Sequence, residues 1–233
     1  MTALLKLYLA PGEAFATLLQ RPRWLPPLLG LMLVQLTLVG TWLSKVDARE
    51  FMKTQIQEAG RWEQIPEAQR EAALDRQAGV LRVFGWLGAI LGPPLVVVVV
   101  AAVYLFIFRF FYESEVDYRR SLTIVASTFL AIGTLTAGLT LLTLALKDDW
   151  NISPQTALQG NVSALLDKDT APKPVWSLAE SLDVFSFWQL GLLASGFAAA
   201  SGLRFSRALS GVLVPWALVV LAKAAFAAVF ALP

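Results

Sequence analysis

Long stretches without a charged residue alternate with strongly polar segments along the chain. Four uncharged stretches, residues 24–44, 83–108, 121–146 and 184–203, are between 20 and 26 residues long by their end numbers. A fifth, residues 208–232, is interrupted only by Lys223. A helix needs about 20 apolar residues to cross the hydrocarbon core of a bilayer. The pattern therefore predicts an all-α integral membrane protein, a bundle of five transmembrane helices at about residues 24–44, 83–111, 121–146, 184–203 and 208–232.

The segment ahead of the first span, residues 1–23, carries apolar residues at helical spacing between Lys6, Arg21 and Arg23. This composition is typical of an amphipathic helix that lies at the boundary between lipid and water. A lead-in that packs on the helical bundle explains it equally well. We therefore expect an amphipathic interfacial lead at residues 1–23 and a five-helix membrane domain at residues 24–233.

Two segments between the spans, residues 45–82 and 147–183, are too polar to lie in lipid. The first contains seven basic and seven acidic residues with interleaved signs. Such interleaving favours solvated helix faces, so we expect two helices divided near Gly60 to Pro66. The second is acidic and contains several prolines, and its apolar residues suit a loop along the membrane surface. Both are therefore expected to be polar external loops.

Small residues mark two of the expected spans. In the second span, Gly88 and Gly92 form a GxxxG pattern that lets another helix approach closely. Pro93 and Pro94 follow and predict a bent helix that is buried in the bundle. The pattern leaves open whether the neighbouring helix belongs to the same chain or to a second copy. The candidate helix-packing or partner-interface residues are Gly88, Gly92, Gly191, Ser195, Ala198 and Gly202.

The composition narrows the chemistry further. Apolar residues make up 57% of the chain, and it contains no cysteine and no histidine. That excludes disulfides, thiolate nucleophiles, Cys/His metal sites and imidazole-activated catalysis. The chain also lacks a GxxxxGK[ST] phosphate-binding loop. We therefore expect no catalytic residue, no cofactor, no metal and no nucleic-acid partner.

Lys223 interrupts the fifth expected span, residues 208–232. An ionisable residue within the membrane is a functional candidate by default, which would support a small transporter or channel. The alternative is that its long stem reaches the outer interface, since it lies ten residues from the C-terminus. The sequence favours this second interpretation.

The distribution of basic residues predicts the orientation. The raw counts of lysine and arginine on the two sides are similar, but orientation follows the basic residues closest to the spans in short segments. Residues of this kind precede the first span and occupy the two short connections. With five spans, these segments all lie on one side of the membrane, and we place that side in the cytoplasm. The N-terminus is then inside, and both polar loops and the C-terminus are outside. The residues are Arg21, Arg23, Arg109, Arg119, Arg120, Arg204 and Arg207.

The order of these segments resembles bacterial members of the Yip1 family. The resemblance covers nearly the whole chain, and its most telling parts are SLDVFSFW at residues 181–188 and VPWALVVLAK at residues 214–223. It implies five spans, a cytoplasmic N-terminus, a bacterial inner membrane location, no cofactor and no established enzymatic reaction. It also implies an accessory role, because some bacterial relatives accompany ABC exporters of the macrolide-efflux type.

Two functions from different classes follow. The first is a non-catalytic accessory protein that packs in the lipid bilayer against another membrane protein, an ABC exporter subunit or a second copy of itself, and modulates it. The alternative is a small transporter or channel that depends on Lys223. An intramembrane hydrolase is not favoured, because no acidic residue lies inside an expected span.

Overall fold

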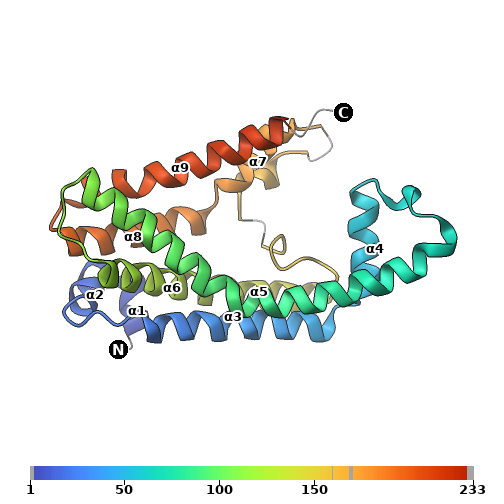
Figure 1. Ribbon diagram of the computed structural model, residues 1–233, viewed down its shortest axis with the longest axis horizontal. Helices are drawn as coiled ribbons and strands as arrows, with labels where there is room; N and C mark the ends of the chain where they lie inside the picture. The colour runs from blue at the N-terminus through green and yellow to red at the C-terminus, as the bar shows by residue number, and fades with distance from the viewer. Residues whose placement is uncertain (1–2, 159, 168–169, 230–233) are drawn as a thin grey trace. The chain divides into compact units, whose positions relative to one another are not determined.

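The computed structural model describes residues 3–158, 160–167 and 170–229 of the chain and shows an all-α membrane protein (Figure 1). Among these residues the only strand-like pairing is an isolated bridge between Asn161 and Asp183. Five helices are long and apolar enough to cross a membrane, which confirms the predicted fold class. They are α3 (Leu25–Lys45), α5 (Glu67–Phe110), α6 (Tyr118–Lys147), α8 (Val184–Ser201) and α9 (Phe205–Val229).

Shorter helices fill the polar segments. The N-terminal lead forms α1 (Ala3–Leu9) and α2 (Pro11–Leu18), and the proline that begins α2 occupies a position where a missing N–H costs little. The remaining short elements are α4 (Ala48–Glu58), η1 (Trp62–Gln64), η2 (Val162–Leu165) and α7 (Lys173–Ser181). The last residues expected in the fifth span, 230–232, lie outside the described part of the chain.

Helix α5 is longer than the span that was expected to begin at residue 83. Its first residues, EAQREAALDRQ, are good helix formers and offer no stop signal before the apolar run. The polar helix of the loop and the second span are therefore one continuous helix. The expected division of the loop near Gly60 to Pro66 is confirmed, because α4 ends at Glu58 and η1 intervenes before Glu67.

The prolines of α5 lie inside the helix, which continues through Pro93 and Pro94. The predicted burial holds for one face only, where Ala89, Pro93 and Val97 follow one another at helical spacing. Large apolar side chains on the other faces are exposed, including Leu91 at 60% and Leu95 at 65%. The expectation of a buried helix is wrong in this respect, because lipid covers apolar side chains without help from protein.

The chain folds into two compact units. The first unit comprises Met1–Leu31, Val96–Thr134 and Gln159–Pro233, and the second comprises Met32–Leu95 and Leu135–Leu158. Helices α3, α5 and α6 therefore contribute residues to both units. Each unit has its own buried contacts and is described separately.

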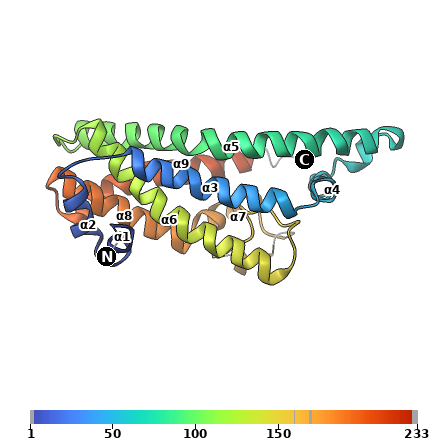
Figure 2. The same ribbon diagram turned by 90° about the horizontal axis from the view of Figure 1, so that it is seen from below.

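In the first unit, α8 packs against α9 and α2, and α7 packs against α9 (Figures 1 and 2). The rings of Phe108 and Phe197 stack with their centroids 4.4 Å apart, and both side chains are fully buried. Phe15 of α2 is also fully buried. These aromatic side chains fill the space between the helices. Apolar helix surfaces gain little by leaving lipid, so the fit of such side chains matters for the packing.

The N-terminal helices belong to this packed unit. The hydroxyl of Tyr8 donates a hydrogen bond to the carbonyl oxygen of Ala131, and its ring meets that of Trp188 edge to face at 5.6 Å. Burial raises the pKa of Tyr8 above its ordinary value. Leu9, by contrast, is 73% exposed. The N-terminal lead therefore packs on the bundle, which was one of the two interpretations of residues 1–23. It also keeps an exposed apolar side chain.

Of the glycines in α8 and its cap, Gly196 lies closest to a neighbouring helix. A Cβ atom there would lie 2.5 Å from Cγ2 of Ile124 and 3.3 Å from Cδ1 of Phe15. Both of these neighbours are fully buried. Only glycine therefore fits between α8, α6 and α2 at this level.

We expect Gly196→Leu to destabilise the protein by about 1–3 kcal/mol, because an inserted side chain overpacks a filled interior. The measurement is the apparent melting midpoint in a mild detergent. Gly191→Leu is the matched control on the same helix, since no atom of a neighbouring element lies within 4 Å of its Cβ position. Equal losses in the two variants would contradict this account of Gly196.

Candidate functional site

The polar loop at residues 45–82 is anchored to a small apolar core of the second unit. Trp42 and Phe51 are buried there and meet edge to face at 5.2 Å. The indole N–H of Trp42 donates to the carbonyl oxygens of Trp150, at 2.9 Å, and Ile152, at 3.1 Å. This core fixes the start of α4 against residues 150–152. Its buried members are Trp42, Val46, Phe51, Leu144 and Ala157.

The start of α4 is held by three further contacts. The carboxylate of Asp47 accepts from the backbone N–H groups of Arg49, at 3.0 Å, and Glu50, at 3.1 Å, and so caps the helix. The backbone N–H of Asp47 donates to Oδ1 of Asn151 at 3.0 Å. The ammonium group of Lys45 lies 4.3 Å from the centre of the Trp150 ring. Side chains on both sides of the cap thus set the direction in which α4 leaves the bundle.

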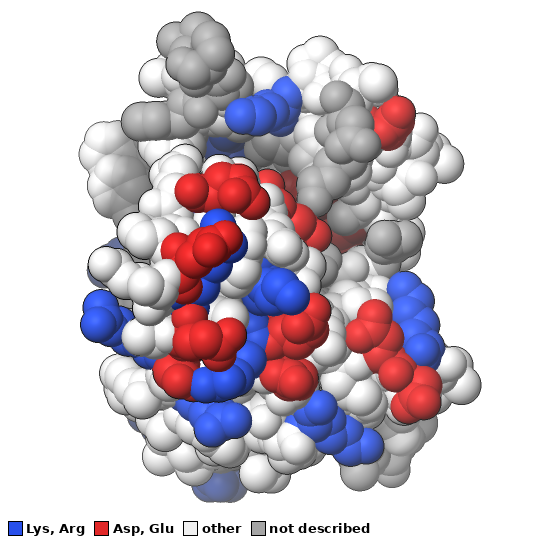
Figure 3. Space-filling view, turned by 90° about the vertical axis from the view of Figure 1, so that its right-hand side faces the viewer, with Lys and Arg blue, Asp and Glu red and all other residues white. Residues whose placement is uncertain are grey.

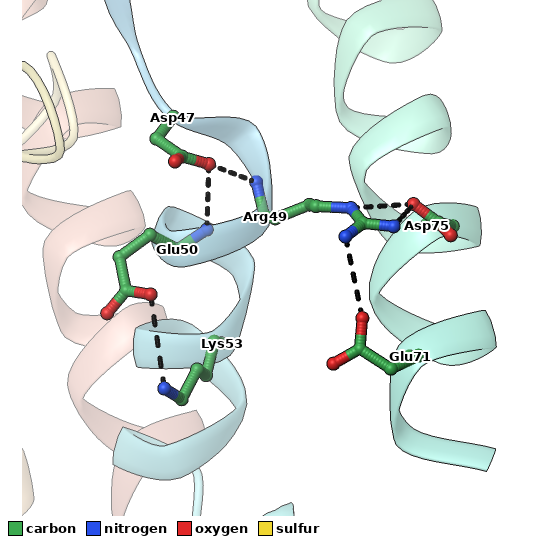
Figure 4. A network of polar contacts seen from close by, with 6 residues as sticks. All are labelled: Asp47, Arg49, Glu50, Lys53, Glu71 and Asp75. Atoms are coloured by element: carbon green, nitrogen blue, oxygen red, sulfur yellow. Dashed lines mark hydrogen bonds and ion pairs between the residues drawn. The ribbon is translucent and has the colours of Figure 1, made fainter. Parts of the chain in front are cut away.

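Arg49 links α4 to α5 (Figure 4). Its guanidinium donates through Nε to Oδ1 of Asp75 at 2.7 Å and through a second nitrogen to the same oxygen, and it reaches Glu71 at 3.4 Å. The hydrogen bond to Asp75 raises the pKa of Arg49 above its ordinary value. These side chains are more than half exposed, so the ion pairs orient the two helices and add little stability.

We call α4, η1 and the part of α5 from Glu67 to Arg82 the charged hairpin. Figure 3 shows the side of the molecule on which Figure 1 draws α4. Acidic and basic side chains are interleaved on that side. Near its tip, Arg70 pairs with Glu63 at 3.4 Å and lies over the ring of Trp62 at 5.1 Å. A surface of this kind presents both signs of charge in fixed places, which suits selection of a partner more than tight binding.

A pocket of about 470 Å³ opens in the charged hairpin. Met52, Ile56 and Ile65 give it apolar walls, and polar side chains line it as well. A pocket with apolar walls and a few polar groups is suited to the side chains of a binding partner. The polar or charged side chains that line it are Gln55, Arg61, Gln64 and Gln77.

The glycines selected from the sequence differ in their surroundings. At Gly88 and Gly92 no atom of another described element lies within 4 Å of the Cβ position, and the same is true at Gly191. Gly202 has a positive φ of 72° and forms the left-handed cap of α8. A cap of this kind is a structural role. Whether Gly88 and Gly92 contact a partner stays a prediction.

The other two candidates act within α8. The hydroxyl of Ser195 donates to the carbonyl oxygen of Gly191 at 2.8 Å, and the carbonyl oxygen of Ala198 accepts from the N–H of Gly202 at 3.0 Å. Both bonds are local to one helix and its cap. The close approach in α8 is instead made by Gly196, which lies within the same small-residue run but was not singled out.

Lys223 of α9 points to a polar partner in the loop. Its ammonium group donates to Oγ of Ser181, the last residue of α7, at 3.4 Å. Helix α7 packs on α9, so the loop supplies this acceptor where the lysine stem ends. The contact gives the ammonium group a polar neighbour outside α9, and whether Lys223 reaches the interface or serves transport stays a prediction.

Comparison with known proteins agrees with the resemblance noted from the sequence. The model of the Yip1 domain matches residues 5–226. No curated protein and no solved structure gave a match to the chain. The matched region includes all five candidate spans, apart from the last residues of α9.

We expect Trp42→Phe to loosen residues 150–152, because it removes the indole N–H that donates to the carbonyl oxygens of Trp150 and Ile152, at a cost of about 1–3 kcal/mol. Hydrogen exchange in detergent should then be faster in residues 148–158. Trp86→Phe is the matched control, since Trp86 lies in the same unit and is 44% exposed. Unchanged exchange in Trp42→Phe would show that the indole hydrogen bonds do not hold this loop.

Proposed function

Because the chain belongs to the Yip1 domain family, we propose that it is a non-catalytic accessory protein of the membrane that binds and modulates another membrane protein through its charged hairpin. The observation that carries the proposal is the hairpin itself. It is fixed at its base by the buried core around Trp42 and is free and charged at its outer face.

The proposed partner is an ABC exporter of the macrolide-efflux type in a bacterial inner membrane. This partner class rests on the resemblance between this chain and bacterial Yip1 proteins. The absence of cysteine, histidine and a phosphate-binding loop supports an accessory role in which another subunit supplies the chemistry. The pocket beside Met52 and Ile56 gives such a partner an apolar place to bury side chains.

The proposed orientation has the N-terminus in the cytoplasm and the charged hairpin on the outer side. Arginines next to the spans at residues 21–23, 119–120 and 204–207 support it. The hairpin would then contact the exporter outside the membrane. Helices embedded in the lipid could make a second contact with it.

The orientation can be tested directly, because a chain without cysteine is a clean background for single-cysteine labelling. We expect Gln57→Cys in α4 to react with a membrane-impermeant maleimide in intact cells. Ser206→Cys, in the first turn of α9, should react only after the membrane is opened. Both positions are exposed, so access to the reagent alone decides the outcome. The reverse pattern would overturn the orientation.

The partner is tested by photo-cross-linking from native membranes. A photoreactive phenylalanine replaces Gln55, which lines the hairpin pocket, or Gln57, which lies about 200° around the same helix. We expect the residue at position 55 to capture an exporter subunit identified by mass spectrometry, with much less product from position 57. The same products from both positions, or repeated recovery of the chain alone, would count against the proposal.

A further inference from the structure

A second pocket lies in the first unit, among α1, α2, the start of α3 and α6. Its volume is about 580 Å³, within the range of small-ligand sites. Most of its wall is apolar and comes from Leu7, Leu18 and Leu130, together with Pro26 and Pro27. Leu7 is only 3% exposed, so this wall is part of the packed unit.

The polar groups of this pocket are few, and three of them lack partners. Arg21 and Arg23 stand at the entrance of the first span and form no ion pair within the described residues. Ser127 of α6 is 3% exposed, lines the pocket, and makes no hydrogen bond through its hydroxyl to another described residue. Thr17, the remaining polar residue, is already bonded to the carbonyl oxygen of Glu13 at 2.9 Å.

These free groups define the chemistry of a ligand. Two guanidinium groups favour a phosphate, which arginine binds through paired hydrogen bonds. The buried hydroxyl of Ser127 offers a further donor among apolar walls. No carboxylate lines the pocket to oppose an anion. A ligand with an anionic phosphate, polar ester groups and apolar chains satisfies all three features together.

We propose that this pocket binds one anionic glycerophospholipid, with its phosphate at Arg21 and Arg23 and an acyl chain along Leu7, Leu18 and Leu130. The arginines lie directly before the first candidate span, where the headgroup region is expected. Basic pockets between membrane helices are a recurrent means of holding acidic lipids. The pocket then ties the N-terminal helices to one leaflet of the bilayer through a bound molecule.

The phosphate chemistry alone would also fit a free phosphate ion, and the apolar wall alone would fit a neutral lipid. The two alternatives separate in one binding experiment. A free phosphate ion needs no acyl chain, so an excess of inorganic phosphate should displace the bound species. A neutral lipid needs no arginine, so phosphatidylcholine should bind as well as phosphatidylglycerol.

The test uses the full chain in detergent and native mass spectrometry with phosphatidylglycerol and phosphatidylcholine of identical acyl chains. We expect retention of phosphatidylglycerol to exceed that of phosphatidylcholine. The double variant Arg21→Gln, Arg23→Gln should lose on the order of tenfold in affinity for phosphatidylglycerol, because both headgroup contacts are removed. The control Arg204→Gln, Arg207→Gln removes the same charge from residues that do not line the pocket and should bind normally.

A measurement on the unaltered chain guards against variants that fail to fold. A photoreactive phosphatidylglycerol should cross-link to peptides that contain residues 17–27 or 127–130, and unlabelled phosphatidylglycerol should compete with it. Cross-links spread over all spans, equal binding of the two lipids, displacement by inorganic phosphate, or equal loss in both double variants would each overturn the proposal.

Discussion

The structure depends on one constraint, which is that lipid offers no hydrogen-bond partner to the backbone. Each segment inside the membrane must satisfy its N–H and C=O groups within its own helix, so the chain crosses only as long uninterrupted helices. Helix α5 shows how far this goes, since it stays helical through Pro93 and Pro94. Its exposed side chains, such as Leu91 and Leu95, need no protein cover because acyl chains surround them.

The same constraint decides what holds the helices together. Apolar side chains gain little by leaving lipid for protein, so specific contacts must select the packing. Close fit is one of them, as where Gly196 leaves room for Ile124 and Phe15. Hydrogen bonds from side chains to backbone carbonyls are another, as where Ser121 donates to Ala101 at 2.7 Å. Contacts of these two kinds therefore contribute to the specificity of the fold.

The sequence predicts the parts of the structure that depend on composition along one helix. Hydropathy alone locates the five spans and the charged loop, and turn residues locate the break near Gly60. Contacts between helices were harder to predict, because they depend on which helices become neighbours. Gly88 and Gly196 are both glycines inside candidate spans, yet of the two only Gly196 meets another helix closely. The indole bonds of Trp42 to residues 150 and 152 had no sequence signal, since backbone carbonyls are present at every residue.

The exposed position of the charged hairpin limits how it can act on a partner. Exposed ion pairs such as those of Arg49 contribute about 1 kcal/mol or less, so charge on this surface can orient a partner but cannot hold it tightly. Affinity must come from apolar area removed from water, at roughly 25 cal/mol for each Å². On the hairpin, that area is offered by the pocket of Met52, Ile56 and Ile65. In the proposed accessory role, the ion pairs therefore help to choose the partner and the pocket holds it.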